Sequence, residues 1–304
     1  MTKKILITGA SGLIGTRLTE LLLAQGHSVS HLGRSKKEGE VPSFIWDIEN
    51  GTMDSTALKD IDTLVHLAGA GIADKRWTVS RKKEIIESRI KSTQLLFHTL
   101  KNNPHSINSF VSASAIGYYG FGHEDKFFFE SDLPGKDFLA EVTKHWEVEV
   151  DKISSLGLRV AKIRIGIVLS EKGGALKEMA RPIKLGLGAP LGTGNQFLSW
   201  VHLDDLCGMF VKAVEDEQMI GSYNAATAWC TNEEMTRAIA KVLHKPLWLP
   251  HVPDFILKII LGEMANVVLK GSKISSEKIR QAGFQFKFNR LEDAIRELDF
   301  TIRR

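Results

Sequence analysis

A glycine-rich segment near the start of the chain has the spacing of a phosphate-binding loop. It reads G-A-S-G-L-I-G at residues 9–15 and directly follows an apolar run at residues 5–7. Between a strand and a helix, the first glycine permits a tight turn, the second lets the backbone approach a pyrophosphate, and the third lets the helix pack closely. The anion then lies at the helix N-terminus, where N–H groups are free. We therefore predict a dinucleotide site, with a ligand-free turn as the alternative, formed by Gly9, Ser11, Gly12, Leu13, Ile14 and Gly15.

The end of the second predicted strand indicates which dinucleotide binds. An acidic residue there would bind the ribose 2′-hydroxyl of NAD. The chain instead has Arg34 and Ser35, with Lys36 and Lys37 beyond them. Because a guanidinium fits a 2′-phosphate that a carboxylate would repel, we predict NADP rather than NAD. A solvated basic loop is the alternative. Asp47, at the end of the third strand, is a candidate for the adenine amino group, or else a solvated turn aspartate.

Two later strand ends add small residues and phenols. The segment H-L-A-G-A at residues 66–70 ends the fourth predicted strand, and its small residues let the backbone of Leu67, Ala68 and Gly69 lie along the cofactor. The segment S-A-S-A-I-G-Y-Y-G at residues 112–120 ends the fifth. It brings Tyr118 and Tyr119 to the carboxyl edge of the sheet, the edge at which ligands bind.

Alternating strands and helices must position these segments. We predict strands at residues 5–7, 28–32, 44–46, 63–67, 110–112 and 159–168, and helices at residues 16–25, 85–100 and 138–153. Such alternation implies right-handed crossovers and a parallel sheet covered on both faces. The fold class is therefore α/β, a Rossmann-like doubly wound parallel sheet. We predict an NADP-binding domain at 1–169 and a smaller substrate-binding region with a C-terminal helical piece at 170–304, some of whose elements return to the sheet.

Composition narrows the class of protein. The chain has 304 residues, 43% hydrophobic and 25% charged, which is typical of a folded domain. The net charge of +4 gives no nucleic-acid footprint. Two cysteines, Cys207 and Cys230, exclude a disulfide framework and a multi-cysteine zinc module. We found no targeting segment and no apolar run of membrane-spanning length, so we predict a cytoplasmic protein with no membrane partner.

Taken together, the motifs resemble a known family. The segments already described, with S-R-I at 88–90, D-F-L-A at 137–140, the glycine-rich loop at 188–196 and W-V-H-L-D-D-L at 200–206, are similar to the extended and atypical short-chain dehydrogenase/reductases. More narrowly, the chain resembles the epimerase-like group assigned to nucleoside-diphosphate-sugar epimerases, with its extra helical piece from about Pro250. The resemblance covers essentially the whole chain.

The resemblance implies a catalytic triad that this chain only partly keeps. Members of the family ordinarily carry Ser, Tyr and Lys, with Tyr and Lys four residues apart on one helix. The resemblance places the serine on Ser114 and the lysine on Lys144, but Ala140 occupies the tyrosine position. Alanine cannot move the substrate proton while the nicotinamide exchanges hydride. We predict that Tyr118 or Tyr119 substitutes; packing or substrate stacking is the alternative. Lys144 would also bind the cofactor, or else is a solvated lysine.

Four further residues are candidates for the cleft. Arg89 is placed with the cofactor residues, a surface ion pair being the alternative. Trp77 would wall the substrate pocket, or else be anchored on the core. In the second region, Arg181 would bind a substrate diphosphate, and Gln196 lies in the glycine-rich loop expected to approach the substrate. For Arg181, the alternative is a solvated side chain on a helix.

Two functions remain open at this stage. The first is an NADP-dependent epimerase or oxidoreductase that acts on a sugar nucleotide or a related hydroxyl or carbonyl substrate. The second is a catalytically silent NADPH-binding redox sensor, which the missing tyrosine favours. The resemblance makes the His202, Asp204 and Asp205 cluster structural, so we predict no metal. The helices at 85–100 and 138–153 either form a homodimer interface or simply cover the sheet.

Overall fold

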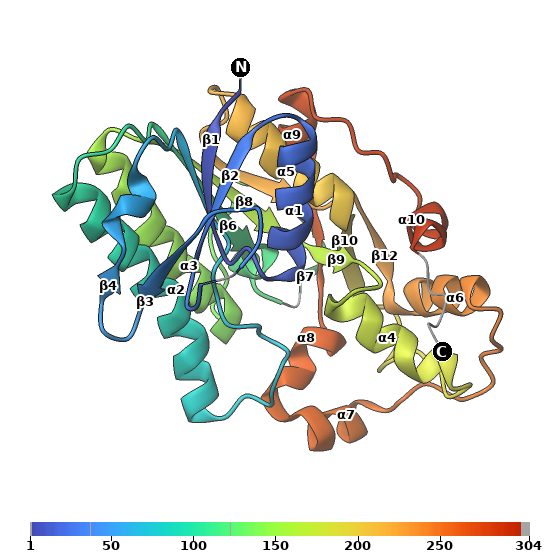
Figure 1. Ribbon diagram of the computed structural model, residues 1–304. Coiled ribbons are helices and arrows are strands. Elements are labelled where there is room, and N and C mark those ends of the chain that lie inside the picture. Colours follow the sequence, from blue (N-terminus) through green and yellow to red (C-terminus); the bar gives the residue numbers. More distant parts are fainter. Residues whose placement is uncertain (1, 37, 122, 299–304) are drawn as a thin grey trace.

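The computed structural model of this chain describes residues 2–36, 38–121 and 123–298. Its main sheet has eight strands in the order β11-β8-β6-β5-β1-β2-β3-β4 (Figure 1). The strands are β1 (Lys4–Thr8), β2 (Ser28–Gly33), β3 (Ser43–Asp47), β4 (Thr52–Met53), β5 (Thr63–His66), β6 (Ser109–Ala115), β8 (Arg159–Ile165) and β11 (Gly221–Ala225). All neighbours are parallel except β3 and β4. The predicted doubly wound α/β fold is therefore confirmed.

Helices cover both faces of this sheet. α1 (Leu13–Ala24) packs against α5 (Leu203–Glu215), and α2 (Val79–Asn102) packs against α3 (Phe138–Lys152), one pair on each side (Figure 1). The central strands are covered on both faces, and Ile5, Leu6 and Ile7 of β1 are fully buried. Sequence patterning placed the start of α2 near residue 85. The helix begins six residues earlier, because the Thr78 side chain accepts a hydrogen bond from the Arg81 N–H and caps it.

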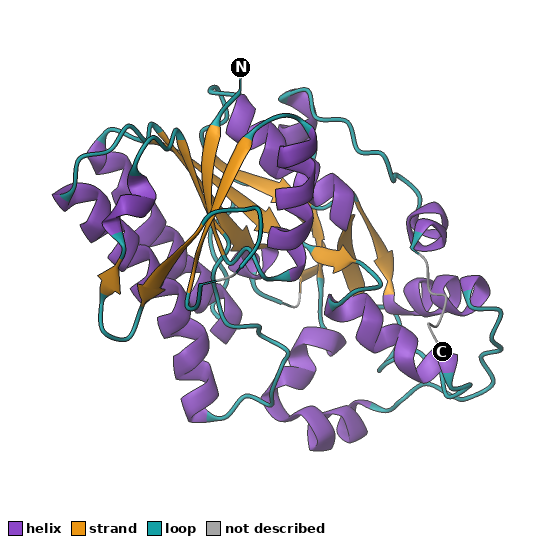
Figure 2. Ribbon diagram, viewed as in Figure 1, coloured by secondary structure: helices purple, strands orange, loops and turns teal. Residues whose placement is uncertain are grey.

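A smaller layer lies beside the main sheet, and most of its elements come from the second half of the chain (Figure 2). A three-stranded sheet has the order β12-β10-β9, and a parallel pair joins β7 to β13. These strands are β7 (His123–Phe128), β9 (Ile167–Leu169), β10 (Phe197–His202), β12 (Ala228–Thr231) and β13 (Ser272–Ile274). The helices are α4 (Gly174–Lys184), α6 (Asn232–Val242), α7 (Asp254–Leu261), α8 (Ala265–Leu269), α9 (Glu277–Gln281) and α10 (Leu291–Glu297). Short 3-10 turns cover Ser55–Leu58, Ile116–Tyr119, Ile153–Leu156 and Gly262–Met264.

One glycine divides the two sheets. The sequence predicted a single strand over residues 159–168, whereas the chain changes sheet at Gly166, between β8 and β9. A Cβ at this position would lie 2.8 Å from the Ser199 carbonyl oxygen and 3.0 Å from that of Ala225. Only glycine lets three backbones approach so closely. The prediction of one continuous strand was therefore wrong, and the reason is a backbone contact that hydrophobic patterning does not report.

The later elements also complete the first core. β11 forms the edge of the main sheet beside β8, and α5 lies against α1. Ile279 and Phe286, from the C-terminal helical piece, pack into the same hydrophobic cluster as β1. The regions on either side of residue 169 thus share one core.

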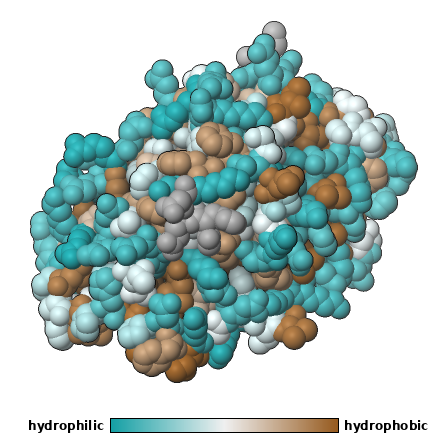
Figure 3. Space-filling model, turned by 180° about the vertical axis from the view of Figure 1, so that it is seen from behind, coloured by the Kyte–Doolittle hydropathy of each residue, from teal (hydrophilic) through white to brown (hydrophobic). Residues whose placement is uncertain are grey.

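α7 is held to the protein on one side only. Leu257 is its buried residue, while Phe255, Ile259 and Ile260 are each more than 60% exposed. Figure 3 shows apolar surface along the lower edge of the molecule, the edge at which Figure 1 places α7. Across the described ranges, no helix combines the length and apolar composition that crossing a bilayer requires.

Candidate dinucleotide and substrate site

Steric contacts explain why the phosphate loop needs glycine at particular positions. Gly9 has a φ of +68°, and a Cβ there would lie 2.8 Å from the Ala68 nitrogen. A Cβ on Gly15 would lie 2.5 Å from the Gly9 carbonyl oxygen, so helix α1 could not approach β1. Gly12 precedes α1; no described side chain caps the helix there, and its first turn holds no acidic residue. The loop therefore presents free N–H groups around Leu13 and Ile14, the cradle that a pyrophosphate fits.

A buried histidine fixes the strand end opposite this loop. His66 Nδ1 lies 2.8 Å from Thr8 Oγ1, which also accepts hydrogen bonds from the N–H groups of Leu67 and Ala68. The other ring nitrogen lies 3.1 Å from Thr93 Oγ1 of α2. Burial, with a smaller contribution from Arg89, lowers the pKa of His66 to about 3, so the ring is neutral. Sequence reasoning missed this role, although Thr8 and His66 end neighbouring strands and pair in register.

The predicted adenosine end is exposed. Arg34 and Ser35 follow β2 at the surface, and Lys37 lies outside the described residues. The Asp47 carboxylate accepts hydrogen bonds from the N–H groups of Glu49 and Asn50 and from the Asn50 side chain. These bonds, led by the Asn50 backbone, lower the pKa of Asp47. This is the geometry of the turn-aspartate alternative.

Arg89 and Gly69 lie against one another beyond the end of β5. A Cβ on Gly69 would lie 3.2 Å from Cζ of Arg89, so the guanidinium rests on the loop backbone. Arg89 Nη1 donates to the Ile85 carbonyl oxygen at 2.9 Å, and its Cζ lies 5.2 Å from the centroid of the Trp146 ring. Burial, followed by repulsion from Arg81, lowers the pKa of Arg89 to about 10. Among the described residues no carboxylate pairs with it, so the ion-pair alternative is not what the structure shows.

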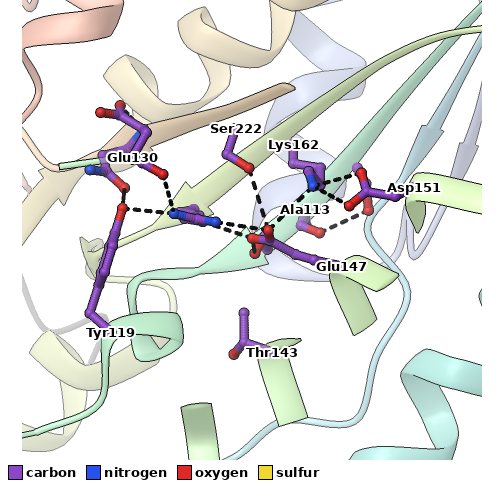
Figure 4. A network of polar contacts seen from close by, with 12 residues as sticks. Ala113, Tyr119, Glu130, Thr143, Glu147, Asp151, Lys162 and Ser222 are labelled. Atoms are coloured by element: carbon purple, nitrogen blue, oxygen red, sulfur yellow. Dashed lines mark hydrogen bonds and ion pairs between the residues drawn. The ribbon is translucent and has the colours of Figure 1, made fainter. Parts of the chain in front are cut away.

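A buried ion pair occupies the place expected for the triad (Figure 4). Ser114 Oγ donates to Glu147 Oε1 at 2.6 Å. Arg164 grips the same carboxylate with Nε at 2.8 Å and Nη2 at 2.9 Å, and Lys162 Nζ lies 3.3 Å away. Burial alone would raise the pKa of Glu147, but Arg164 and Lys162 outweigh it and the net shift is downward. The Ser114 hydroxyl is therefore committed to a carboxylate of its own protein.

The two tyrosines have different environments. Tyr119 is 1% exposed; its hydroxyl donates to Asn224 Oδ1 at 2.7 Å and accepts from Arg164 Nη1 at 2.9 Å. Burial raises the pKa of Tyr119 to about 12. Tyr118 is half-buried, its ring lies 3.6 Å from Cζ of Arg164, and its hydroxyl forms no hydrogen bond with the described part of the chain. The structure thus favours packing for Tyr119 and leaves Tyr118 as the available phenol.

Lys144 lies on a different side of α3 from Val142 and Trp146. It is exposed on α3, and it is two residues from both Val142 and Trp146. At about 100° per residue, it points to nearly the opposite side of the helix from each. Val142 packs with Ile85 of α2, and Trp146 faces Arg89. The structure therefore does not bring Lys144 together with Arg89; its exposure suits the solvated-lysine alternative, and its role at the cofactor stays a prediction.

Trp77 is part of a small core at the edge of the cleft. It is 9% exposed, its Nε1 donates to the Ile72 carbonyl oxygen at 2.8 Å, and its ring contacts Phe138 at a centroid distance of 4.9 Å. The cluster also holds Leu139 of α3, and Met264 packs against it from the C-terminal piece. Trp77 is thus anchored on the core, where it ties the loop before α2 to α3.

The two predicted substrate residues of the second region are not brought together. Arg181 is exposed near the end of α4. Gln196 is 3% exposed, and its Nε2 donates to the carbonyl oxygens of Leu191 and Val268. Gln196 therefore joins the glycine-rich loop to α8 from inside. The sequence correctly placed Gln196 in the glycine-rich loop. It did not indicate that the side-chain amide points into the protein.

The histidine and aspartates at the start of α5 are engaged in structural bonds. His202 Nδ1 accepts from the Asp204 N–H, Asp204 pairs with Arg17 at 2.7 Å, and Asp205 accepts from the N–H groups of Lys287 and Phe288. Within the ranges that the structure covers, no group of His, Cys, Asp and Glu could hold a metal ion. This cluster fastens the C-terminal piece to α1 and α5.

The sequence analysis did not identify Glu147 and Arg164, which form the buried ion pair. A signal was present, because β8 places Lys162 and Arg164 two residues apart in its buried stretch, beside Val160, Ala161 and Ile163. Cations at alternate positions of a buried strand require a buried anion. Glu147 supplies it from the inward face of α3.

The fold and this cleft define a dinucleotide-binding α/β protein, and comparisons with known proteins give its family. Residues 5–226 match the model of the NAD dependent epimerase/dehydratase family, and residues 252–298 match a domain of unknown function, DUF1731. The chain belongs to the epimerase/dehydratase family, and the resemblance stated from the sequence is confirmed.

Curated relatives and a solved structure agree with this assignment. The chain is 38% identical to the chloroplastic Epimerase family protein SDR39U1 homolog of Arabidopsis thaliana, covering 96% of this chain and 85% of the relative. It is 35% identical to the Epimerase family protein YfhF of Bacillus subtilis, with 97% of each covered. The crystal structure of human SDR39U1 isoform 2 with NADPH superposes with a TM-score of 0.86 at 28% identity, covering 98% of this chain and 100% of that one.

Proposed function

We propose that this chain binds NADP(H) and transfers hydride to or from a hydroxyl or carbonyl substrate, as an oxidoreductase or epimerase. The observation that carries the proposal is the phosphate loop. Gly9 and Gly15 leave room that any side chain would fill, and the N-terminus of α1 is free of competing acids. The human relative named above was crystallised with NADPH, which supports the same dinucleotide here. Arg34, in place of an acid after β2, favours the 2′-phosphate.

We assign each residue of the site a separate role. The first turn of α1 would bind the pyrophosphate, and the loop at Leu67, Ala68 and Gly69 would support the cofactor along β5. The bound nicotinamide supplies or accepts the hydride. Tyr118, the phenol with an uncommitted hydroxyl, would give its proton to the carbonyl oxygen as hydride reaches the carbon, or take it back in the reverse direction. Arg164, over its ring, holds that phenol in place.

The test begins with the bound ligands. Purified protein is denatured, and the released small molecules are identified by mass spectrometry. We expect NADP(H); a nucleotide sugar beside it would support the epimerase form, and NADP(H) alone the reductase form. NAD in its place would contradict the proposed role of Arg34. With no dinucleotide released and none bound on titration with NADPH, the proposal fails.

The tyrosine assignment is tested by two matched variants. With the substrate identified, Tyr118→Phe should lower kcat by about 10² or more, the usual contribution of a positioned acid or base, and leave the Kd for NADPH unchanged. Tyr119→Phe should keep most of its turnover, because that hydroxyl is sealed by Asn224 and Arg164. Full turnover in Tyr118→Phe would contradict the assignment.

One set of contacts favours a second function, an NADPH-binding redox sensor. The Ser114 hydroxyl is committed to Glu147, Ala140 replaces the tyrosine, and Lys144 lies away from Arg89. A sensor would bind NADPH more tightly than NADP⁺ and turn over no carbonyl compound in a broad panel. We also propose a cytoplasmic location, consistent with the two buried free cysteines. A homodimer formed through α2 and α3 stays a prediction, which sedimentation checks.

A further inference from the structure

Arg89 differs from the other cations around it on helix α2. Those cations pair with carboxylates of the described residues: Arg81 with Glu84 and Asp74, Lys82 with Glu263, Lys83 with Glu87, and Lys91 with Glu87 and Glu49. Arg89 has no such partner, although it is less exposed than Lys83, which has one. Its hydrogen bond to the Ile85 carbonyl oxygen leaves the positive charge uncompensated.

An enclosed charge without a partner is costly to keep. Desolvation, with repulsion from Arg81, disfavours the charged guanidinium, and both effects lower the pKa of Arg89. The fold nevertheless makes room for it, because Gly69 omits the side chain that would meet the guanidinium. An anion that reached this guanidinium would compensate its charge.

The free edge of the guanidinium fits a carboxylate. Nη1 is occupied by the Ile85 carbonyl oxygen, whereas Nε and Nη2 have no hydrogen-bond partner in the described part of the protein. These two groups present parallel N–H donors, the pair that binds both oxygens of a carboxylate. Arg89 thus offers one bidentate contact.

The position of Arg89 separates it from the cofactor phosphates. The phosphate loop follows β1, and the neighbouring strands run β6-β5-β1. Arg89 lies beyond β5, between Gly69 after that strand and Trp146 of α3, which packs on β6. A dinucleotide with its pyrophosphate at α1 and its adenosine over β2 places its nicotinamide on the β5–β6 side. Arg89 is therefore on the side where the substrate must approach.

We propose that Arg89 binds the carboxylate of the substrate, and that the substrate is a hydroxyl or carbonyl compound with a carboxylate close to the reacting carbon. This inference rests on the proposed function and narrows its substrate class. Bidentate binding would fix the orientation of the carbon that exchanges hydride, with Tyr118 at the oxygen. The nearby Arg81, held by Glu84 and Asp74, adds positive potential at longer range.

Oxalate is the probe for this site, because it is a small dicarboxylate without a reducible carbonyl. It is titrated at constant ionic strength into the free protein and into protein saturated with NADP⁺, with tryptophan fluorescence as readout. Trp146 lies 5.2 Å from the guanidinium and reports its occupancy. In a parallel titration, the Kd for NADPH is measured by cofactor fluorescence.

Matched variants separate the two anion sites. Arg89→Met keeps the aliphatic stem and removes the charge; we expect oxalate affinity to fall at least tenfold and the Kd for NADPH to change less than threefold. Arg34→Met should give the reverse pattern. Arg89→Lys should retain part of the oxalate affinity, and Lys91→Met, on the same helix, should change neither. Without ligand, Arg89→Met should melt at the same temperature or higher, since an unpaired charge is removed; a structural arginine would lower it.

Each other outcome has a defined meaning. An equal loss of NADPH and oxalate affinity in Arg89→Met would assign Arg89 to the cofactor and overturn the proposal. The absence of oxalate binding to the wild type, free and NADP⁺-loaded, would overturn it as well. If NADPH fails to bind the wild type, the proposed function fails instead, and the oxalate titration of the free protein still decides the role of Arg89.

Discussion

The phosphate loop and the triad position differ in whether their polar groups have hydrogen-bond partners. At the N-terminus of α1, N–H groups are left without a side-chain cap from the described residues, and the surrounding glycines keep that space open. At the triad position, Ser114, Glu147, Arg164 and Tyr119 satisfy one another in a closed network (Figure 4). Unsatisfied groups mark a site that waits for a ligand, whereas satisfied ones stabilise the fold. The comparison teaches that cofactor binding and catalysis can diverge within one cleft.

The largest effect is expected from closing the open site. Gly15→Ala would place a Cβ 2.5 Å from the Gly9 carbonyl oxygen and 2.6 Å from Ala10 Cα, and neither backbone atom can yield without moving α1. We expect NADPH affinity to fall by about 10² or more, measured by fluorescence titration on protein shown to be folded by circular dichroism. Gly173→Ala is the control, because a Cβ there meets no atom within 4 Å. Unchanged affinity in Gly15→Ala would remove the phosphate loop from the site.

The next effect comes from opening the closed network. Glu147→Gln leaves Arg164 without its anion, whereas Lys162 keeps Asp151 at 2.7 Å, and breaking a buried ion pair costs about 3–5 kcal/mol. Chemical denaturation measures the free energy of unfolding. Glu141→Gln, exposed on the same helix, should change it by less than about 0.5 kcal/mol. A loss below about 1 kcal/mol for Glu147→Gln would show that the network does not stabilise the fold.

The same pair predicts a pH dependence. The pKa of Glu147 is below its ordinary value in the folded protein, so its contribution is complete above the unfolded pKa of about 4.3 and declines as pH falls through the folded pKa. The difference in stability between wild type and Glu147→Gln should therefore shrink as the pH is lowered below about 4. A difference that grew on acidification would contradict the downward shift.

The phosphate loop and the buried network also differ in how well the sequence predicts them. The phosphate loop was predictable because its glycine spacing reflects local backbone geometry, which a short segment determines by itself. The network was not, since Ser114, Glu147, Arg164 and Asn224 come from four elements and meet only after the sheet is assembled. The contacts of Lys144 were not predictable for a related reason: a motif gives spacing along a helix, but tertiary contacts decide which face is buried.

A smaller effect should distinguish the two adjacent tyrosines. Tyr119→Phe removes the hydroxyl between Asn224 and Arg164 and leaves buried polar atoms unpaired, at a cost of about 1–3 kcal/mol in unfolding free energy. Tyr118→Phe should cost less than about 0.5 kcal/mol, because its hydroxyl has no partner in the described part of the chain. Equal losses would mean that both phenols belong to the closed network, and Tyr118 would no longer be available as the proton donor.

The smallest effect, and the sharpest test of how far this cleft has diverged, concerns Lys144. In the triad that the family resemblance implies, this lysine touches the cofactor. Here it is exposed, on the side of α3 away from Val142 and Trp146. Lys144→Met should therefore change the Kd for NADPH less than twofold and stability by less than about 0.5 kcal/mol. Lys152→Met, whose side chain pairs with Glu149 at the far end of α3, is the matched surface control. A tenfold loss confined to Lys144→Met would mean that the helix turns toward the cofactor when it binds, and that the open and closed parts of the cleft are coupled after all.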